Sequence, residues 1–359
     1  MRRTLALGFA LLCLGLLPLD ALSQTPWEDV PAPVTGGLFS QPALLAIGNK
    51  VHLFWAGTTG KIPDPELMYC KRAEGDQDWS EPRAPFFGRD QGRVRRLAVA
   101  GTRHTIGVVF QRQLTQGHRA FEILFTASPD LGWAFTEPIV VDSFVCEHPR
   151  GTSLSVAARD HLQRVEYAAA WATEGSGIKA ALLNLRDNVR APARTLGSHG
   201  PLSDRVQIGG HAKGGFGVVW STGQSLRSVR LKAMSGEADE PQTLVTKNVG
   251  PNFSVATRLR GPLELVATLD RDNFLFRFND GSWERQTTPA VPAGATPPVP
   301  GTNPAATLDS DDHRHVLYSL STQVYYVHDR GGDWSVPEKV FDLKSPDAVF
   351  SIACTDQYV

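Results

Sequence analysis

The chain contains 359 residues, of which 42% are hydrophobic and 20% are charged, and its formal net charge is −1 at pH 7. A chain of this length can bury a large hydrophobic core without help from cross-links. The near-neutral charge gives no general reason to expect nucleic acid or an anionic membrane as a partner.

The first residues have the pattern of a secretory signal peptide. Two arginines precede an uncharged run from Leu5 to Leu17, and Ala21-Leu22-Ser23 supplies small residues for cleavage. The run is too short to span a bilayer comfortably, so a membrane anchor is the weaker interpretation. We expect residues 1–23 to be removed, which leaves a secreted or periplasmic protein with a single domain over residues 24–359 and no membrane span.

Three cysteines remain after that cleavage, namely Cys70, Cys146 and Cys354. An exported protein can form one disulfide from three cysteines, and the odd count leaves one thiol over. The sequence does not indicate which two would pair.

An apolar run that ends in or near an aromatic residue recurs six times, roughly fifty residues apart, which is typical of a repeat architecture. The runs are Val51–Trp55, Ile106–Phe110, Tyr167–Trp171, Phe216–Trp220, Leu263–Ala267 and His315–Tyr318. Each run follows a short apolar segment and a turn, as in Ala43–Asn49, and precedes another strand-like segment, as in Glu122–Thr126. Tyr167 and Tyr318 lie inside these runs and are expected to be core residues.

These units predict an all-β fold, because short strands and frequent turns replace any 3.6-residue periodicity. About four strands in each unit are the proportion of a β-propeller blade, so we predict a six-bladed β-propeller. A pair of β-sandwiches is the alternative, but it does not explain the period. We expect Val349–Cys354 to add a strand that closes the ring, and Pro289–Pro304 to connect the fifth and sixth blades.

A tight turn is predicted at Ser128–Phe135, with the pattern Ser-x-Asp-x-Gly-x-x-aromatic. Short Ser and Asp side chains can accept backbone N–H groups, Gly132 can adopt a positive φ, and the aromatic side chain can fold back onto the sheet. Degenerate copies occur at Arg72–Pro82, Asn279–Trp283 and Asp329–Pro337. The recurrence makes this turn a marker of the blades.

These turns, on six units of this size, resemble the Asp-box (bacterial neuraminidase repeat) proteins of the sialidase superfamily. The resemblance covers nearly the whole chain after residue 23. It implies a six-bladed propeller whose Asp-boxes lie on the face opposite the active site. It does not by itself imply catalysis, because one fold carries many functions.

The catalytic pattern of that family is incomplete in this chain. Sialidases open with Phe-Arg-Ile-Pro, whose arginine binds the substrate carboxylate, whereas this chain has Phe39-Ser40-Gln41-Pro42. Asp64 matches the acid/base aspartate by position, and it also fits an ordinary surface turn between two prolines. No tyrosine nucleophile begins the sixth unit at Thr302-Asn303-Pro304, and Asp204 is only a loose match to the activating glutamate. The resemblance therefore implies a propeller without standard sialidase catalysis.

The residues that begin the innermost strands of a propeller converge on its axis, where a ligand site is expected. Those starts contain Ser40 and Gln41, then Arg95 and Arg96, Arg150, Asp204 and Arg205, Asn252, and Asn303. Three successive units begin with arginine, and clustered guanidinium groups suit a carboxylate or a sulfate. Salt bridges between blades are an equally compatible role, since arginine is common at surfaces.

Histidines offer weaker hypotheses. His313 and His315 share one strand face, but no third metal ligand is apparent in the sequence, so solvated or strand-capping roles are preferred. Three histidines near the arginines are candidate bases for a lyase-like reaction on uronic acids, namely His148, His199 and His211. The nucleophile elbow, phosphate-binding loop and dinucleotide fingerprint are absent from the sequence. We predict no cofactor and no metal.

We therefore expect an exported, monomeric, six-bladed propeller that recognises a carbohydrate, neutral or anionic, through its axial funnel, without standard sialidase catalysis. The expected ligand-binding residues are Gln41, Arg95, Arg96, Arg150, Asp204 and Arg205. The first alternative is a divergent glycoside hydrolase or polysaccharide lyase that uses Asp64. The second is a scaffold for protein interactions, in which the arginines are structural.

Overall fold

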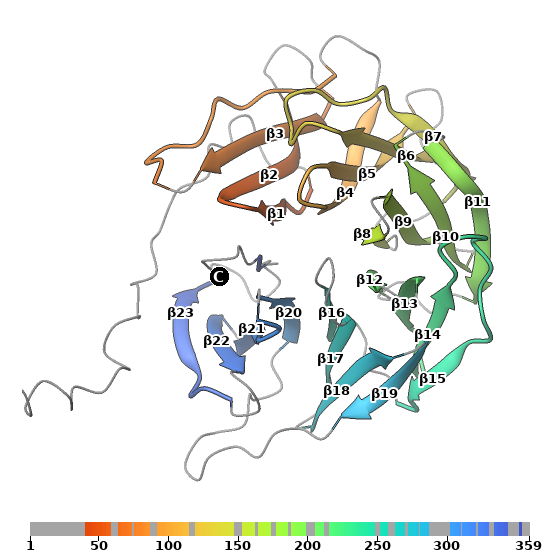
Figure 1. Ribbon diagram of the computed structural model, residues 1–359, viewed down its shortest axis with the longest axis vertical. Helices are drawn as coiled ribbons and strands as arrows, with labels where there is room; N and C mark the ends of the chain where they lie inside the picture. The colour runs from red at the N-terminus through yellow and green to blue at the C-terminus, as the bar shows by residue number, and fades with distance from the viewer. Residues whose placement is uncertain are drawn as a thin grey trace, which may run out of the picture. The chain divides into compact units, whose positions relative to one another are not determined.

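Six antiparallel sheets follow one another along the chain and form a ring in the computed structural model (Figure 1). Among the residues that the structure describes, the first sheet has three strands and each of the other five has four, and within each sheet every strand pairs with its neighbour in the sequence. One strand of each sheet lies nearest the centre of the ring, and the following strands lie progressively farther out. The chain is thus a six-bladed β-propeller, and the predicted fold class is confirmed.

The structure describes residues 40–353 with internal gaps. The gaps are residues 59–63, 74, 87–91, 115–118, 147–152, 162–163, 174–176, 186–187, 199–204, 212–214, 248–251, 258–262, 270–271, 280, 287–301, 310, 321, 330–333 and 344–351. The chain divides into two compact units, Met1–Ala32 and Pro33–Val359, and all that follows concerns the second. The predicted signal peptide lies outside the described residues.

The first three sheets cover the N-terminal half of the ring. The first sheet contains β1 (Ala43–Ile47), β2 (Lys50–Gly57) and β3 (Glu66–Ala73). The second contains β4 (Arg93–Gly101), β5 (Ile106–Gln113), β6 (Ala120–Ser128) and β7 (Ile139–Val145). The third contains β8 (Ser153–His161), β9 (Arg164–Thr173), β10 (Gly177–Asn184) and β11 (Asn188–Gly197).

The remaining three sheets complete the order. The fourth contains β12 (Val206–His211), β13 (Gly215–Ser221), β14 (Leu226–Leu231) and β15 (Gln242–Val245). The fifth contains β16 (Phe253–Thr257), β17 (Leu263–Leu269), β18 (Asp272–Asn279) and β19 (Ser282–Gln286). The sixth contains β20 (Thr302–Leu308), β21 (Arg314–Leu320), β22 (Gln323–Asp329) and β23 (Glu338–Asp342).

The second strand of every sheet is the apolar run predicted from the sequence. Trp55, Phe110, Trp171 and Trp220 in these strands are all fully buried. Successive side chains of a strand point to opposite faces, so a run without polar alternation needs packing partners on both faces. Each second strand has such partners, because it lies inside its sheet and between neighbouring blades. Tyr167 and Tyr318 are buried as expected.

Neighbouring blades share hydrophobic clusters across their facing surfaces. Phe54 and Tyr69 of the first sheet pack with Phe110 of the second. A similar cluster joins each further pair of consecutive sheets, from the second and third to the fifth and sixth. In the described part of the chain, the buried residues of the sixth and first sheets belong to separate clusters. Ile352, near the C-terminus, packs against the sixth sheet. Within the described residues, the junction between the sixth and first sheets therefore differs from the other five.

The predicted closing strand and disulfide both involve the C-terminal segment. Of Val349–Cys354, only Ile352 and Ala353 are described, and neither belongs to a strand. Cys70 and Cys146 are both buried and do not pair with each other, and Cys354 lies outside the described residues. Burial raises the pKa of the Cys70 thiol to about 12, which makes it unreactive.

The Ser128–Phe135 turn connects β6 to β7, and its polar side chains act as the sequence predicts. The Ser128 hydroxyl donates to the Asp130 carboxylate at 2.6 Å and accepts the Gly132 N–H at 2.7 Å. Asp130 also accepts the N–H groups of Trp133 at 3.1 Å and Ala134 at 2.9 Å. Gly132 has a φ of 87°. The turn is therefore fixed by its own side chains.

The aromatic residue of this turn reaches the neighbouring blade. Phe135 makes edge contacts with the rings of Phe54 and Tyr69 in the first sheet. The aromatic residues of the degenerate copies Asn279–Trp283 and Asp329–Pro337, Trp283 and Trp334, are buried as well. All of these turns follow the third strand of a sheet, so the motif marks individual blades and holds adjacent blades together.

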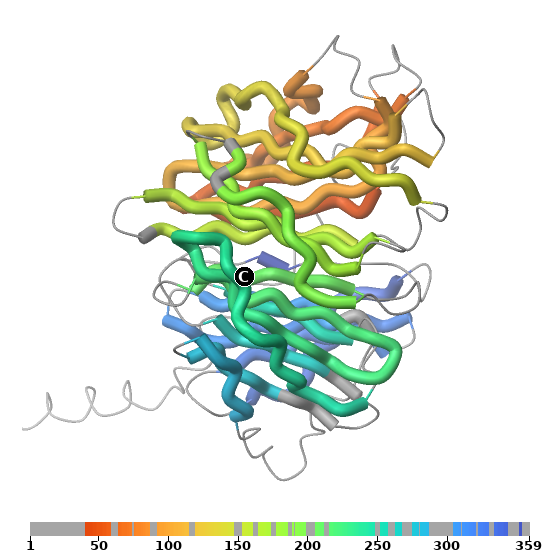
Figure 2. The backbone as a smooth tube through the Cα atoms, turned by 90° about the vertical axis from the view of Figure 1, so that its right-hand side faces the viewer, coloured from red at the N-terminus to blue at the C-terminus, as the bar shows by residue number. Residues whose placement is uncertain are grey.

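The ends of the strands define two faces of the ring. Arg93 at the start of β4 pairs with Gln113 at the end of β5, whereas Ser128 at the end of β6 pairs with Ile106 at the start of β5. The Ser128–Phe135 turn thus lies at the opposite end of the sheet from the beginning of β4. Figure 2 shows the strands from the side, with connections gathered at their two ends. We call the end where β1, β4, β8, β12, β16 and β20 begin the start face, and the other end the turn face.

Among the described residues there is no helix that is long and apolar enough to cross a membrane.

Candidate functional site

The start face of β4 carries three arginines, Arg93, Arg95 and Arg96. The pairing of β4 with β5 shifts between Val94 and Arg96, which leaves Arg95 as the extra residue of a β-bulge. A bulge redirects a side chain and interrupts the regular alternation of the strand. This irregularity allows adjacent arginines at the edge of the sheet that faces the axis.

Arg95 is held in place by a neutral group. Its Nε and Nη2 atoms donate to the side-chain oxygen of Gln113 at 2.9 and 2.7 Å. Gln113 is buried at the end of β5, so the oxygen has a fixed position. An amide oxygen orients the guanidinium without neutralising it, and Arg95 is therefore a positioned positive charge.

The surroundings of these arginines disfavour their charge. Burial lowers the pKa of Arg95, the neighbouring Arg93 lowers it further, and Asp64 acts in the opposite direction. Burial also lowers the pKa of Arg96. Groups with pKa values perturbed in this way concentrate at functional sites.

Asp64, the candidate acid/base residue, lies beside these arginines and forms an ion pair. Its Oδ1 atom accepts a hydrogen bond from Arg93 Nε at 2.7 Å, and both side chains are partly exposed. The pair joins the connection that precedes β3 to the start of β4, across two blades. The structure therefore brings Asp64 to the predicted arginines, and gives it a partner that the sequence did not identify.

Glu66 is a second carboxyl group at this edge, and sequence analysis did not select it. It is buried at the first position of β3, and its Oε2 atom has no hydrogen-bond partner. Burial raises the pKa of Glu66, which favours the neutral carboxylic acid. Its burial could have been predicted from its spacing, because Glu66, Met68 and Cys70 are alternate residues of one strand and alternate residues lie on the same face.

Arg205 stands immediately before β12, at the start of the fourth sheet. Its Nη1 atom donates to the carbonyl oxygen of Phe253 in the fifth sheet at 3.2 Å, and its own N–H donates to Ser221 Oγ at 3.3 Å. Burial lowers the pKa of Arg205 to about 10. The hydrogen bond to the next blade matches the structural role that sequence analysis kept as an alternative. The third sheet separates Arg205 from Arg95 and Arg96 around the ring.

Ser40 has a structural role at the start of the first sheet. Its hydroxyl accepts the N–H of Ala56 at 2.9 Å and donates to the carbonyl oxygen of Gln41 at 3.1 Å. The Gln41 side chain is exposed. Arg150, Asp204, His148 and His199 lie outside the described residues.

The prediction that His211 lies near Arg205, where it could act as a base, is wrong. It is the last residue of β12, whereas Arg205 precedes the first, so the two lie at opposite ends of the strand. Six residues of strand separate their α-carbons by roughly 20 Å. The error arose because proximity in sequence is not proximity in space when the intervening segment is extended.

His313 and His315 share a partner on the turn face. His313 Nδ1 lies 3.0 Å, and His315 Nε2 3.2 Å, from the same carboxylate oxygen of Asp309. No group of three potential metal ligands in the described residues is arranged to hold an ion. Both histidines are therefore assigned to hydrogen bonding with Asp309, which sequence analysis had not connected with them.

No family model matches the sequence, and neither does any curated protein. Among solved structures, the chain is similar to the SapL1 lectin in complex with α-methyl fucoside, with a TM-score of 0.48, 12% identity, and coverage of 84% of this chain and 96% of that one. A lectin from Aleuria aurantia, a six-bladed β-propeller that recognises fucose, gives 0.45 and 14%, with coverage of 72% and 83%. The polysaccharide lyase Uly1 gives 0.45 and 10%, with coverage of 85% and 78%. The fold assignment rests on the six sheets themselves.

Proposed function

We propose that the start face binds an anionic carbohydrate, whose carboxylate or sulfate group is held by the arginines at the beginning of β4. The observation that carries this proposal is the fixed guanidinium of Arg95, which is oriented by the neutral oxygen of Gln113 at 2.9 and 2.7 Å. A planar guanidinium donates two parallel hydrogen bonds to a carboxylate or sulfate. The protein would act as an exported monomer without standard sialidase catalysis, since Ser40 replaces the family arginine.

The local charge supports an anionic ligand. Asp64 and Arg93 compensate each other at 2.7 Å, and the raised pKa of Glu66 favours its neutral form. Arg95, which is held by a neutral amide oxygen, therefore adds positive charge to this edge. The whole chain has a net charge of only −1, so the attraction is local and does not extend over a broad surface. A small charged group on a polar ligand fits this pattern better than nucleic acid does. Gln41, Arg150, Asp204 and Arg205 are proposed as further ligand-binding residues.

We expect Arg95→Ala to weaken binding of a carboxylated or sulfated glycan by about 10- to 100-fold, because a hydrogen bond to a charged group contributes about 1.5–3 kcal/mol. Arg95→Lys should recover only part of the loss, since lysine keeps the charge and lacks the planar fork. Binding would be measured on an array that carries carboxylated, sulfated and neutral glycans.

A matched control removes a positive charge elsewhere. Lys339 lies in the outermost strand of the sixth sheet, where it pairs with Asp342 at 2.9 Å and is partly exposed. Lys339→Ala should leave glycan binding unchanged. If Arg95→Ala and Lys339→Ala behave alike, or if neutral glycans bind as well as anionic ones, the proposed site is wrong.

A second candidate function, a divergent glycosidase or lyase, is favoured by one observation. Glu66 is a buried carboxyl group with a raised pKa, as a general acid requires, and its Oε2 atom has no partner. Asp64, in contrast, is bound by Arg93. For this function we propose Glu66 as the proton donor and Asp64 as a residue that positions Arg93.

If the protein is an enzyme of this kind, Glu66→Gln should lower turnover about 100-fold or more, the usual contribution of general acid catalysis. Asp64→Asn should have the smaller effect. The measurement is the release of reducing ends or of unsaturated products from the glycans that bind. If Asp64→Asn lowers turnover as much as Glu66→Gln or more, Asp64 is the catalytic residue. If glycans bind but no product is released, the protein binds carbohydrate without catalysis, as first proposed.

A further inference from the structure

The turn face of the sixth sheet contains a chain of three hydrogen-bonded side chains. Tyr326 Oη lies 2.6 Å from His315 Nδ1, and His315 Nε2 lies 3.2 Å from Asp309 Oδ2. A carboxylate can only accept a hydrogen bond, so Nε2 of His315 carries the proton. In the neutral imidazole, Nδ1 is then the acceptor of the Tyr326 hydroxyl. The arrangement forms a continuous path for a proton from Tyr326 to His315, with Asp309 behind it.

Asp309 is well fixed as the last member of this chain. Its Oδ1 atom accepts the backbone N–H groups of Asp311 at 2.8 Å and His313 at 2.9 Å, and its Oδ2 atom accepts from His313 Nδ1 at 3.0 Å. Burial by itself would raise the pKa of Asp309, but these hydrogen bonds and that from His315 lower it to about 2. Asp309 is therefore ionised at neutral pH and can stabilise a protonated His315.

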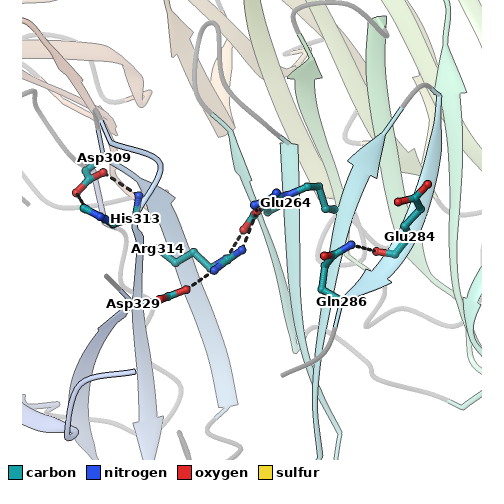
Figure 3. A network of polar contacts seen from close by, with 8 residues as sticks. Glu264, Glu284, Gln286, Asp309, His313, Arg314 and Asp329 are labelled. Carbon is teal, nitrogen blue, oxygen red and sulfur yellow. Dashed lines mark hydrogen bonds and ion pairs between the residues drawn. The ribbon is translucent and has the colours of Figure 1, made fainter. Parts of the chain in front are cut away.

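The other charged groups around the three residues are already engaged. Arg314, next to His315, pairs with Glu264 of the fifth sheet and with Asp329 of β22, so its charge is directed away from Asp309 (Figure 3). His328 stacks on both His315 and Tyr326, with ring centroids 6.2 and 5.6 Å apart. The stacking fixes the imidazole plane beside the phenol. Tyr326 itself is only half-buried.

The first sheet contains the same pair without the carboxylate. His52 Nδ1 lies 2.9 Å from Tyr69 Oη, and each tyrosine stands two residues before the partner of its histidine on the adjacent strand. His52 Nε2, however, is buried without a hydrogen-bond partner. Burial, together with Lys71 and Lys50, lowers the pKa of His52 to about 4, and burial raises that of Tyr69 to about 12. This pair lacks any group that would stabilise a transferred proton.

We propose that Asp309, His315 and Tyr326 form a second reactive site, separate from the start face, in which Tyr326 is a nucleophile for activated acyl groups. The phenol oxygen of Tyr326 forms a bond to the acyl carbon, and the bond from that carbon to its leaving group breaks. The phenol proton moves to Nδ1 of His315 and then to the leaving group. Asp309 orients the imidazole and stabilises its transient positive charge, as the third member of a catalytic triad does. Asp309 is a positioning residue and Tyr326 the reacting one.

The test treats the complete protein with N-acetylimidazole and follows acetylation of each tyrosine by peptide mass spectrometry. Tyr325 is the internal reference, because it is adjacent, half-buried, and donates to the neutral oxygen of Gln323 at 2.8 Å. We expect Tyr326 to react at least about tenfold faster, since general base catalysis contributes roughly 10²- to 10⁴-fold. Its rate should level off above neutral pH, whereas the rate at Tyr325 should continue to rise.

Two variants separate a proton relay from a merely structural role. Asp309→Asn should reduce the rate at Tyr326 about tenfold or more and abolish its pH plateau, with the rate at Tyr325 unchanged. His52→Gln, the matched change in the first sheet, should leave the rate at Tyr326 unchanged. The proposal is overturned if Tyr326 reacts no faster than Tyr325 in the wild-type protein, a comparison that needs no variant to fold. It is also overturned if folded Asp309→Asn reacts as the wild type does.

Discussion

Replacing Glu264 with alanine should lower the free energy of unfolding by about 3–5 kcal/mol, the range seen when one partner of a buried ion pair is removed. Glu264 is almost fully buried in β17, where it accepts hydrogen bonds from Arg277 at 2.9 and 2.7 Å and from Arg314 Nη2 at 3.0 Å. Arg314 belongs to the next blade, so this carboxylate connects the fifth and sixth sheets (Figure 3). Its loss leaves the mostly buried Arg314 without one of its two carboxylate partners, whereas Arg277, whose side chain is 43% exposed, stays hydrated.

The contacts of Arg314 show why the loss of stability in Glu264→Ala should be large. Burial acts to lower its pKa, but its contacts with Glu264 and Asp329 raise the pKa overall. Without Glu264, only Asp329 remains to balance Arg314, and Arg277 loses its partner. The measurement is chemical denaturation of the variant and the wild type, followed by far-ultraviolet circular dichroism.

Glu237→Ala is the matched control, because it removes the same charge from an exposed pair. Glu237 lies 3.5 Å from Lys232, and its side chain is 60% exposed. A surface pair of this kind contributes about 0–1 kcal/mol, so this variant should unfold almost as the wild type does. A loss below about 1 kcal/mol for Glu264→Ala would contradict the importance of the junction between the blades.

Gly132→Ala should destabilise the protein by about 2–5 kcal/mol, the second largest effect that we expect. A φ of 87° costs a residue with a Cβ atom about 1–2 kcal/mol. The added methyl group would also lie 2.6 Å from Cζ of Tyr69 in the neighbouring blade, and such overpacking costs about 1–3 kcal/mol. Tyr69 would have to move, which would disturb its 2.9 Å hydrogen bond to the buried His52. Thermal and chemical unfolding would measure the change.

Gly75→Ala isolates the backbone part of this effect. Gly75 lies in a degenerate copy of the same turn and has a φ of 81°, but a Cβ atom there would meet no atom within 4 Å. We expect a loss of only about 1 kcal/mol. If the two variants lose the same stability, contact of the turn with the adjacent blade contributes nothing, and the turn only closes its own hairpin.

The local features of the fold could be predicted because they depend on neighbours in the sequence. Each apolar run, such as Phe216–Trp220, is the second strand of its sheet. The turn at Ser128–Phe135 forms the predicted hydrogen bonds because Ser128 and Asp130 need only reach N–H groups two to four residues away. Periodicity, turn chemistry and spacing are therefore sufficient for the six blades.

The chemistry of the candidate sites was less predictable, because it depends on pairs of residues in different strands or blades. Asp64 was selected by position, but its pairing with Arg93 joins residues 29 apart. Glu66 was overlooked because a charged residue at the start of a strand is usually solvated, and only the packed ring buries it. Asp309 lies close to His313 and His315 in sequence, but nothing in the spacing shows that both rings turn toward one carboxylate.

By itself the sequence determined the all-β class, the number of blades, the positions of their second strands and the location of the turns. These follow from the two-residue alternation of strands and from the backbone preferences of glycine, serine and aspartate. Only the tertiary structure decided which polar residues are buried and what each one contacts. Closing six sheets into a ring brings together residues about fifty positions apart, such as Glu264 and Arg314. The ring therefore buries these charged groups together, and no local pattern of the sequence encodes that pairing.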